Sequence, residues 1–268
     1  MQTHEMTRLA VAAGTVVAAG SAAPAADAPK VDPAALDKAF EALKTYDWGK
    51  DRSALQALDD AVAAAHGDAA ARKALETRLA AVVTSDAPRA AKDVVCRQLS
   101  LVGSAEAVPA LAGLLTNAEL SQMGRYALER IPDAAATAAL RDALPKTEGL
   151  LKVGVINSLG VRRDAESTAA LTALLENQDQ QVAAAAAAAL GAIGSPEAAK
   201  ALDEFQKKAP DKLKLAVADA RLCSAERLLA AGKKLEAMAI YNSLKGEDQP
   251  KHVRLAAVRG LVAVTGKK

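Results

Sequence analysis

The sequence contains few residues whose type and spacing could support catalysis or metal binding. Its histidines are His4, His66 and His252, and they form neither an HExxH motif nor an i, i+4 pair, the spacing that brings two zinc ligands onto one helix face. Asp59 and Asp60 are adjacent carboxylates, but they fall on the polar face of an expected helix, where a charge is ordinarily solvated. No nucleophile elbow, phosphate loop or dinucleotide-binding glycine pattern occurs. The sequence therefore predicts a protein that is not an enzyme, with no cofactor and no metal site.

The two cysteines give no sign of a disulfide or a redox motif. Cys96 and Cys223 are 127 positions apart and belong to no Cys-x-x-Cys motif. In a linear array of repeats they would lie several units apart, whereas a disulfide requires Cα atoms within about 7 Å of each other. We expect two buried thiols that pack as small apolar side chains.

Composition favours an all-α protein. Hydrophobic residues make up 51% of the 268 residues, but aromatic residues only 2%. Alanine and leucine have the highest helix propensities, whereas β-sheets favour aromatic and β-branched side chains. The net charge of +2 gives no electrostatic reason to expect binding to nucleic acid or to an anionic membrane.

The first 25 residues have the pattern of a secretory signal peptide. Arg8 precedes an uncharged run from Leu9 to Gly20, and Ala23 to Ala25 fit the A-x-A cleavage pattern. The run is shorter than the roughly 20 apolar residues of a membrane span. We therefore expect a mature chain from Ala26, exported to the periplasm or the extracellular space, with no membrane span. The alternatives are an uncleaved anchor or a disordered, alanine-rich tail.

A repeat of about thirty residues occupies the middle of the chain. Its leading leucines are spaced 29, 31 and 31 residues apart, and each is followed by a second leucine twelve positions later; they are Leu99, Leu128, Leu159 and Leu190. In the fourth unit, Gly194, Ser195 and Pro196 provide the residues that end one helix and start the next. Each unit therefore reads as helix, turn, helix, and it can bury its apolar face only by stacking on its neighbours.

These features predict an all-α fold, a right-handed α-solenoid of two-helix repeats with divergent helical caps. We expect an N-terminal helical cap over residues 26–90, repeats over 91–208 and a C-terminal helical cap over 209–268. The alternative is an alanine-rich coiled coil or bundle, but a heptad pattern does not place a Gly/Pro break every thirty residues or so.

Two stretches resemble the HEAT-repeat superfamily: Ala-Val-Pro-Ala-Leu at residues 107–111 and Ala-Leu-Gly-Ala-Ile-Gly at residues 189–194. The period is closest to the short, phycobilin-lyase-type HEAT-like repeats, and the resemblance covers about residues 93–208. Residues 229–244 are weakly similar to a tetratricopeptide hairpin. The resemblance implies architecture far more than activity. Di-iron hydroxylases in the wider family use His-Glu pairs, and the only such pair here, His4-Glu5, falls in the expected signal peptide.

The second helix of each unit is the one that lines the concave surface in HEAT-like stacks. Relative to the leading leucine, positions 0, −1, −4 and −8 should be core, while −2, −6 and +1 should face outward. The outward +1 positions would be Ser100, Glu129, Gly160 and Gly191. Polar residues gather on this face in the first units, flanked by Arg130, Arg162 and Arg163, and Arg and Tyr are favoured at interface hot spots. We therefore expect a partner-binding surface that includes Arg97, Arg125, Tyr126, Glu129 and Asn157.

The function that follows is an exported, non-catalytic scaffold that binds a protein or peptide partner along the solenoid. One alternative is an accessory subunit or helper of an exported enzyme. Another is an enzyme similar to the phycobilin lyases, although the sequence contains no evident pigment pocket.

Overall fold

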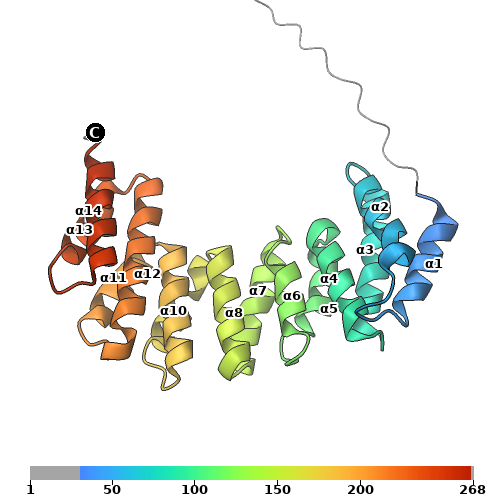
Figure 1. Ribbon diagram of the computed structural model, residues 1–268, viewed down its shortest axis with the longest axis horizontal. Helices are drawn as coiled ribbons and strands as arrows, with labels where there is room; N and C mark the ends of the chain where they lie inside the picture. Colours follow the sequence, from blue (N-terminus) through green and yellow to red (C-terminus); the bar gives the residue numbers. More distant parts are fainter. Residues whose placement is uncertain (1–30, 267–268) are drawn as a thin grey trace, which may run out of the picture.

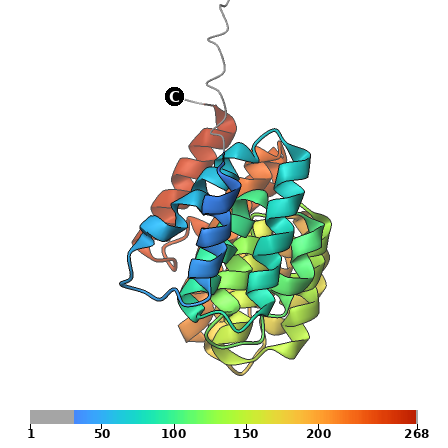
Figure 2. The same cartoon turned by 90° about the vertical axis from the view of Figure 1, so that its right-hand side faces the viewer.

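The computed structural model describes residues 31–266, and the expected signal peptide at residues 1–25 lies outside them. Over this part of the chain there are fourteen α-helices, four short 3-10 helices and no β-strand. Consecutive helices pair into seven hairpins that stand side by side, from α1 at one end of the molecule to α14 at the other (Figure 1). Figure 2 looks along this array from its N-terminal end, with α1 and α2 in front. The arrangement confirms the predicted all-α solenoid of two-helix repeats.

The hairpins form two rows of helices. The first helix of each hairpin belongs to row A, in which α3, α5 and α7 contact one another in turn and α9 contacts α11. The second helix belongs to row B, in which every helix contacts the next. Row A comprises α1 (Pro33–Leu43), α3 (Ala69–Thr84), α5 (Val108–Ala112), α7 (Ala134–Ala143), α9 (Thr168–Leu174), α11 (Pro196–Gln206) and α13 (Lys234–Leu244). Row B comprises α2 (Gln56–Ala64), α4 (Arg89–Val102), α6 (Ser121–Leu128), α8 (Gly149–Arg162), α10 (Gln180–Ile193), α12 (Asp211–Ala230) and α14 (Lys251–Thr265).

The predicted break in the fourth unit is confirmed in detail. Gly194 ends α10 with a φ of 62°, in the left-handed region that glycine adopts without a steric penalty. The Ser195 side chain then accepts a hydrogen bond from Ala198 N, and Pro196 occupies the first position of α11. Within the expected C-terminal cap, the first helix, α12, begins at Asp211 directly after Pro210.

The four leading leucines form the centre of the core, and each is fully buried. A continuous apolar cluster extends from Ala39 to Ala220, and a second one, from Ala218 to Ala257, meets it on α12. Gln98 and Ser158 occupy the predicted core position −1, and both are buried although they are polar.

The prediction that position +1 faces outward is wrong for Gly160 and Gly191, which are buried against the next helix of row B. A Cβ atom on Gly160 would lie 2.9 Å from Ala189 Cα, and one on Gly191 would lie 2.5 Å from the Ala220 carbonyl oxygen. The first contact joins position +1 of the third unit to position −1 of the fourth. Ala220 lies 31 residues after Ala189, in the equivalent place on α12, so we number it −1 as well. Glycine and alanine therefore allow the backbones of α8, α10 and α12 to approach closely.

Among residues 31–266, no helix combines the length and the apolar character that crossing a membrane requires.

Gly191→Ala tests how far the stack depends on this contact. We expect a loss of about 1–3 kcal/mol in the free energy of unfolding, because the new methyl group meets backbone atoms of α12 that cannot move aside cheaply. The control is Gly113→Ala, where the nearest atom would lie at 3.4 Å. That change should be neutral or should stabilise by up to about 1 kcal/mol. Urea unfolding followed by circular dichroism measures both, and equal effects would contradict the packing argument.

Candidate functional site

A connected line of charged, aromatic and polar side chains crosses row B from α4 to α8. We call it the Arg–Tyr ladder, and its members are Asp93, Arg97, Arg125, Tyr126, Glu129, Arg130 and Ser158. At its centre, the guanidinium of Arg97 lies 5.6 Å from the centroid of the Tyr126 ring, and that of Arg130 lies 3.7 Å from it. A cation above an aromatic ring is attracted by the negative face of the π system. Tyr126, half-buried, is therefore held by two cationic side chains.

Hydrogen bonds fix both arginines beside the ring. Arg97 Nε donates to Asp93 Oδ2 at 3.1 Å, and this bond and the charge of Asp93 raise the pKa of Arg97 above its ordinary value. Arg130 Nη1 donates to the Tyr126 carbonyl oxygen at 2.9 Å and lies 3.7 Å from Glu129 Oε2. Both guanidinium groups are thus oriented by hydrogen bonds within the protein.

The other end of the ladder joins α6 to α8. Ser158 Oγ donates to Glu129 Oε1 at 2.7 Å, and Arg125 Nη1 donates to the Gly154 carbonyl oxygen at 3.1 Å. Arg125 is half-buried, and burial lowers its pKa, with the charge of Glu129 opposing the shift. A Cβ on Gly154 would lie 2.7 Å from Arg125 Cζ, so a larger residue at this position would displace the guanidinium.

The structure brings four of the five predicted site residues together. Arg97, Tyr126 and Glu129 belong to one chain of contacts, and Arg125 joins it through Ser158 while lying flat on α8. Asn157 is exposed on α8, and within residues 31–266 its side chain makes no hydrogen bond. It is therefore a neighbour of the ladder rather than a member.

Sequence reasoning named Arg130 only as a residue flanking the surface and did not single out Asp93 or Ser158. Asp93 and Arg97 have the i, i+4 spacing of a helical ion pair, as do Tyr126 and Arg130 for a side-chain contact, so that spacing was an available signal. A hydroxyl at a position expected to be core was the signal for Ser158. Its partner, Glu129, lies in the preceding unit, which sequence spacing alone does not reveal.

Arg162, expected to flank the binding surface, stabilises the end of α6 instead. Its guanidinium donates to the carbonyl oxygens of Leu128 and Ile131 at 2.7 Å and of Asp133 at 2.9 Å. These carbonyls lie at the end of α6 and just after it, where no intrahelical donor is available. Arg163, by contrast, is exposed and has a φ of 53°, a left-handed conformation that costs a non-glycine residue energy.

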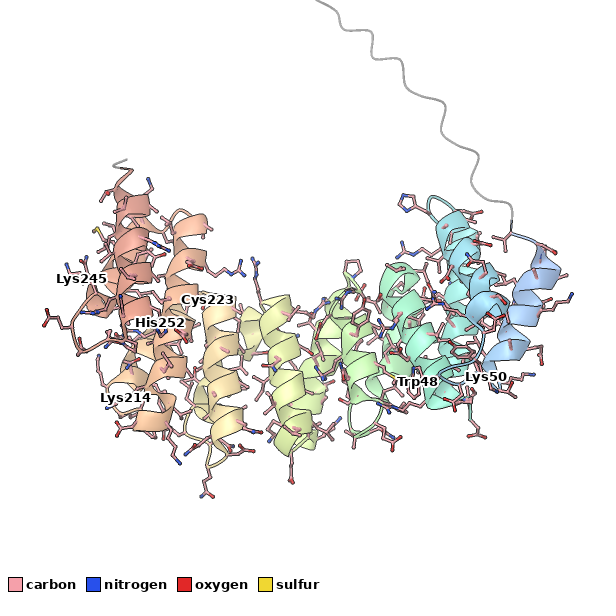
Figure 3. All side chains as sticks on the ribbon, viewed as in Figure 1. Trp48, Lys50, Lys214, Cys223, Lys245 and His252 are labelled. Carbon is pink, nitrogen blue, oxygen red and sulfur yellow. The ribbon has the colours of Figure 1, made fainter. Side chains whose placement is uncertain are left out.

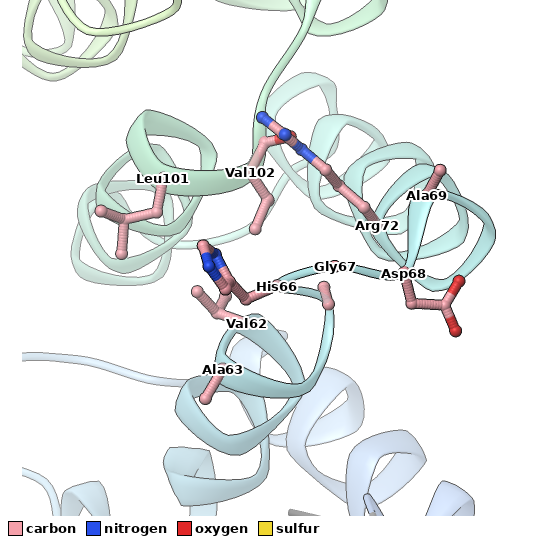
Figure 4. Close-up of a pocket in the computed structure, with 10 residues that line it drawn as sticks. Val62, Ala63, His66, Gly67, Asp68, Ala69, Arg72, Leu101 and Val102 are labelled. Carbon is pink, nitrogen blue, oxygen red and sulfur yellow. The ribbon is translucent and has the colours of Figure 1, made fainter. Parts of the chain in front are cut away.

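A cavity of about 650 Å³ lies between the α2–α3 turn and the end of α4 (Figure 4). Val62, Leu101 and Val102 supply the apolar walls of the cavity, and the His66 imidazole also lines it. Arg72 also lines the cavity, but its Nε is already bonded to the Val102 carbonyl oxygen at 2.7 Å. Within the described residues no three His, Cys, Asp or Glu side chains are grouped as metal ligands would be.

Both cysteines are unpaired in the described structure, but their environments differ. Cys96 is buried, and burial raises the pKa of its thiol to about 12. Its thiolate, the reactive form, is therefore scarce at neutral pH. The expectation that both thiols are buried is wrong for Cys223, which is only half-buried.

The two helical rows, the recurring +1 to −1 contact and the surface line of polar residues define an α-solenoid repeat protein. Residues 147–220, from just before α8 to the middle of α12, match the family model of HEAT repeats. This part of the chain consists of HEAT repeats. The finer assignment to the phycobilin-lyase-type branch stays a prediction.

Two further comparisons complete this picture. No curated protein matches the chain. A crystal structure described as an engineered protein is 20% identical, with 86% of this chain and 68% of that chain covered and a TM-score of 0.43.

Arg162 and Arg163 are adjacent, so variants of the two test how the chain is stabilised at the ends of α6 and α8. Arg162→Ala should lower the free energy of unfolding by about 2–4 kcal/mol, because it leaves the carbonyls at the end of α6 without donors. Arg163→Gly should raise it by about 1 kcal/mol, because glycine adopts the left-handed conformation without strain. Urea unfolding measures both changes. A harmless Arg162→Ala would show that this residue does not stabilise α6.

Proposed function

We propose that this HEAT-repeat protein is a non-catalytic scaffold that binds a protein or peptide partner at the Arg–Tyr ladder. The observation that carries the proposal is the Tyr126 ring, fixed on row B by the two guanidinium groups of Arg97 and Arg130. A preoriented aromatic side chain beside arginines is the composition of an interface hot spot, because it loses little conformational freedom on binding.

The exposure of the charged groups indicates what kind of partner fits. The side chains of Arg97 and Arg130 are 57% and 44% exposed, whereas those of Asp93 and Glu129 are 23% and 18% exposed. The acidic groups therefore face the protein, where they orient the arginines, and the positive charges face solvent. Complementarity favours a partner segment that is acidic and carries an apolar or aromatic side chain for Tyr126.

We also propose that the scaffold is exported, on the evidence of the signal-peptide pattern at residues 1–25. Expression of the full chain in a bacterial host followed by fractionation tests this proposal. We expect the protein in the periplasm or the medium with Ala26 as its first residue, as determined by mass spectrometry. An intact N-terminus in the cytoplasmic fraction would contradict export.

The double variant Arg97→Ala with Tyr126→Ala tests the ladder. Affinity purification from the native host with quantitative mass spectrometry should show partners captured by the wild type and lost from the variant by about tenfold or more, because the hot-spot ring and its cation are gone. The matched control is Trp48→Ala with Arg89→Ala, which removes an exposed aromatic–guanidinium pair outside the ladder. Retention of every partner by the ladder variant would refute the proposal, as would equal losses in both variants.

A further inference from the structure

The exposed face of α14, the last helix of the described array, is apolar. The opposite face of this helix carries buried Val253 and Ala257, which pack with the apolar residues of α12 and α13. Leu255, Val258 and Val262 are 49%, 47% and 50% exposed. Their spacing of i, i+3 and i+7 places these three side chains in one line along the helix. We call this line the α14 stripe.

The other end of the array has no such face. The exposed residues of α1 include Asp37, Lys38 and Glu41, and none of them is a large hydrophobic residue. Within residues 31–266, nine large hydrophobic residues are exposed; three of them form the α14 stripe, and no other helix has more than two. The terminal units of a solenoid need a polar outer face to remain soluble alone. The α14 stripe therefore has the character of a contact surface.

Every lysine, arginine, aspartate or glutamate on α14 is basic. The helix carries Lys251, Arg254 and Arg259, and it contains no aspartate or glutamate. Arg259 directly follows Val258 and lies one turn before Val262, so its exposed side chain stands beside the α14 stripe. The apolar stripe is thus bordered by positive charge.

The acidic groups at this end of the molecule do not neutralise Arg259, which forms no ion pair within the described residues. Figure 3 shows His252 and Lys245 at this end of the array. Asp219 lies 3.6 Å from His252 Nε2, at the first turn of the helix. The acidic residues 247–248 belong to the turn before α14, and Arg259 lies about 12 Å along the axis from the start of the helix. That distance exceeds the screening length of about 8 Å at physiological salt.

We propose that the α14 stripe binds an amphipathic helix of another protein, whose apolar face is bordered by aspartate or glutamate side chains. A helix fits because the other face of α14 already packs on helices, and an i, i+3, i+7 line of side chains is the surface onto which a second helix docks. Acidic residues fit because the charges of α14 are basic throughout. The site lies outside the Arg–Tyr ladder and does not depend on it.

Two other occupants fit the α14 stripe less well. A second copy packed α14 on α14 about a twofold axis would bring two basic helices together, with Arg259 near the centre of the contact. A head-to-tail copy would place the stripe against α1, whose exposed face has no large hydrophobic residue. An anionic lipid surface would gain only three half-exposed side chains of moderate size, because the rest of the apolar surface of α14 is packed on α12 and α13.

The experiment measures binding of two dye-labelled, amidated helical peptides by fluorescence anisotropy. Both have leucines along one face; the acidic peptide has glutamates beside them, and the basic peptide has lysines at the same places. We expect the acidic peptide to bind with a dissociation constant on the order of 100 micromolar, and the basic peptide to bind at least tenfold more weakly. NMR spectra of the ¹⁵N-labelled protein should show saturable shifts confined to the backbone amides of α14 and its neighbours.

Variants of exposed residues separate binding from folding. Val258→Glu should weaken binding of the acidic peptide about tenfold, because it places a like charge in the stripe. Arg259→Glu should weaken the acidic peptide about fivefold and strengthen the basic peptide by a similar factor. The matched control is Leu150→Glu, which adds the same charge at a residue of α8 that is 76% exposed, and its affinity should equal that of the wild type. Circular dichroism checks that all three variants are folded.

The ladder variant Arg97→Ala with Tyr126→Ala should bind the acidic peptide as the wild type does, so failure of one site leaves the other standing. Equal binding of the two peptides would overturn the proposal, as would unchanged affinity in Val258→Glu. Vesicles of phosphatidylglycerol and phosphatidylcholine test the lipid alternative, and sedimentation velocity tests a second copy. Vesicle binding that is tighter than peptide binding and lost in Val258→Glu would overturn the proposal in favour of a lipid. Self-association lost in Val258→Glu would overturn it in favour of a second copy.

Discussion

The close approach of consecutive row B helices is the constraint on which the solenoid depends. A stack of hairpins has no central core, so each unit is held mainly by its neighbours. Between α8, α10 and α12 the neighbouring units are joined by close backbone contacts, in which the +1 glycine of one helix packs against the −1 alanine of the next. A side chain at the +1 position would push the rows apart and expose the leucines behind them. The small residues of the fourth unit are therefore required by the close packing of its helices.

The same contact explains why the polar surface lies where it does. Between α6 and α8 the +1 and −1 positions are Glu129 and Ser158, and the helices are joined by a hydrogen bond of 2.7 Å instead of by touching backbones. Longer side chains then occupy the space between these helices, and Arg125 lies across Gly154. The same two positions, +1 and −1, thus carry small residues that pack tightly in the later units and polar residues that form the Arg–Tyr ladder in the earlier ones. The candidate site is a consequence of how this pair of units is spaced.

Much of this architecture could be predicted from the sequence, because it is encoded locally. The leading leucines, the Gly194-Ser195-Pro196 break and the helical composition each depend on residues close together in the chain. The direction of the +1 position could not be predicted, because it depends on the angle between units. The two arginines at 162 and 163 look equivalent in sequence, and only the backbone conformation at the end of α8 separates a residue that stabilises α6 from an exposed one.

Arg221 follows Ala220 at the place where a fifth leading leucine would fall, and the sequence did not lead us to expect a buried arginine there. A repeat identified by its leucines ends at the first unit in which the leucine is replaced, although the structural register continues through Ala220. That replacement falls on α12, where the two apolar clusters meet and the chain passes from the HEAT repeats into the last hairpin. Within a regular stack, the next unit covers position 0 with apolar side chains, and a guanidinium there would be left without partners. Where the stack changes, Asp203 and Ser243 reach the position instead, and a charge becomes tolerable inside the array. A buried charge inside this solenoid therefore depends on partners from neighbouring elements, as it also does at buried Glu76, whose carboxylate accepts hydrogen bonds from Ser104 Oγ and Ala107 N.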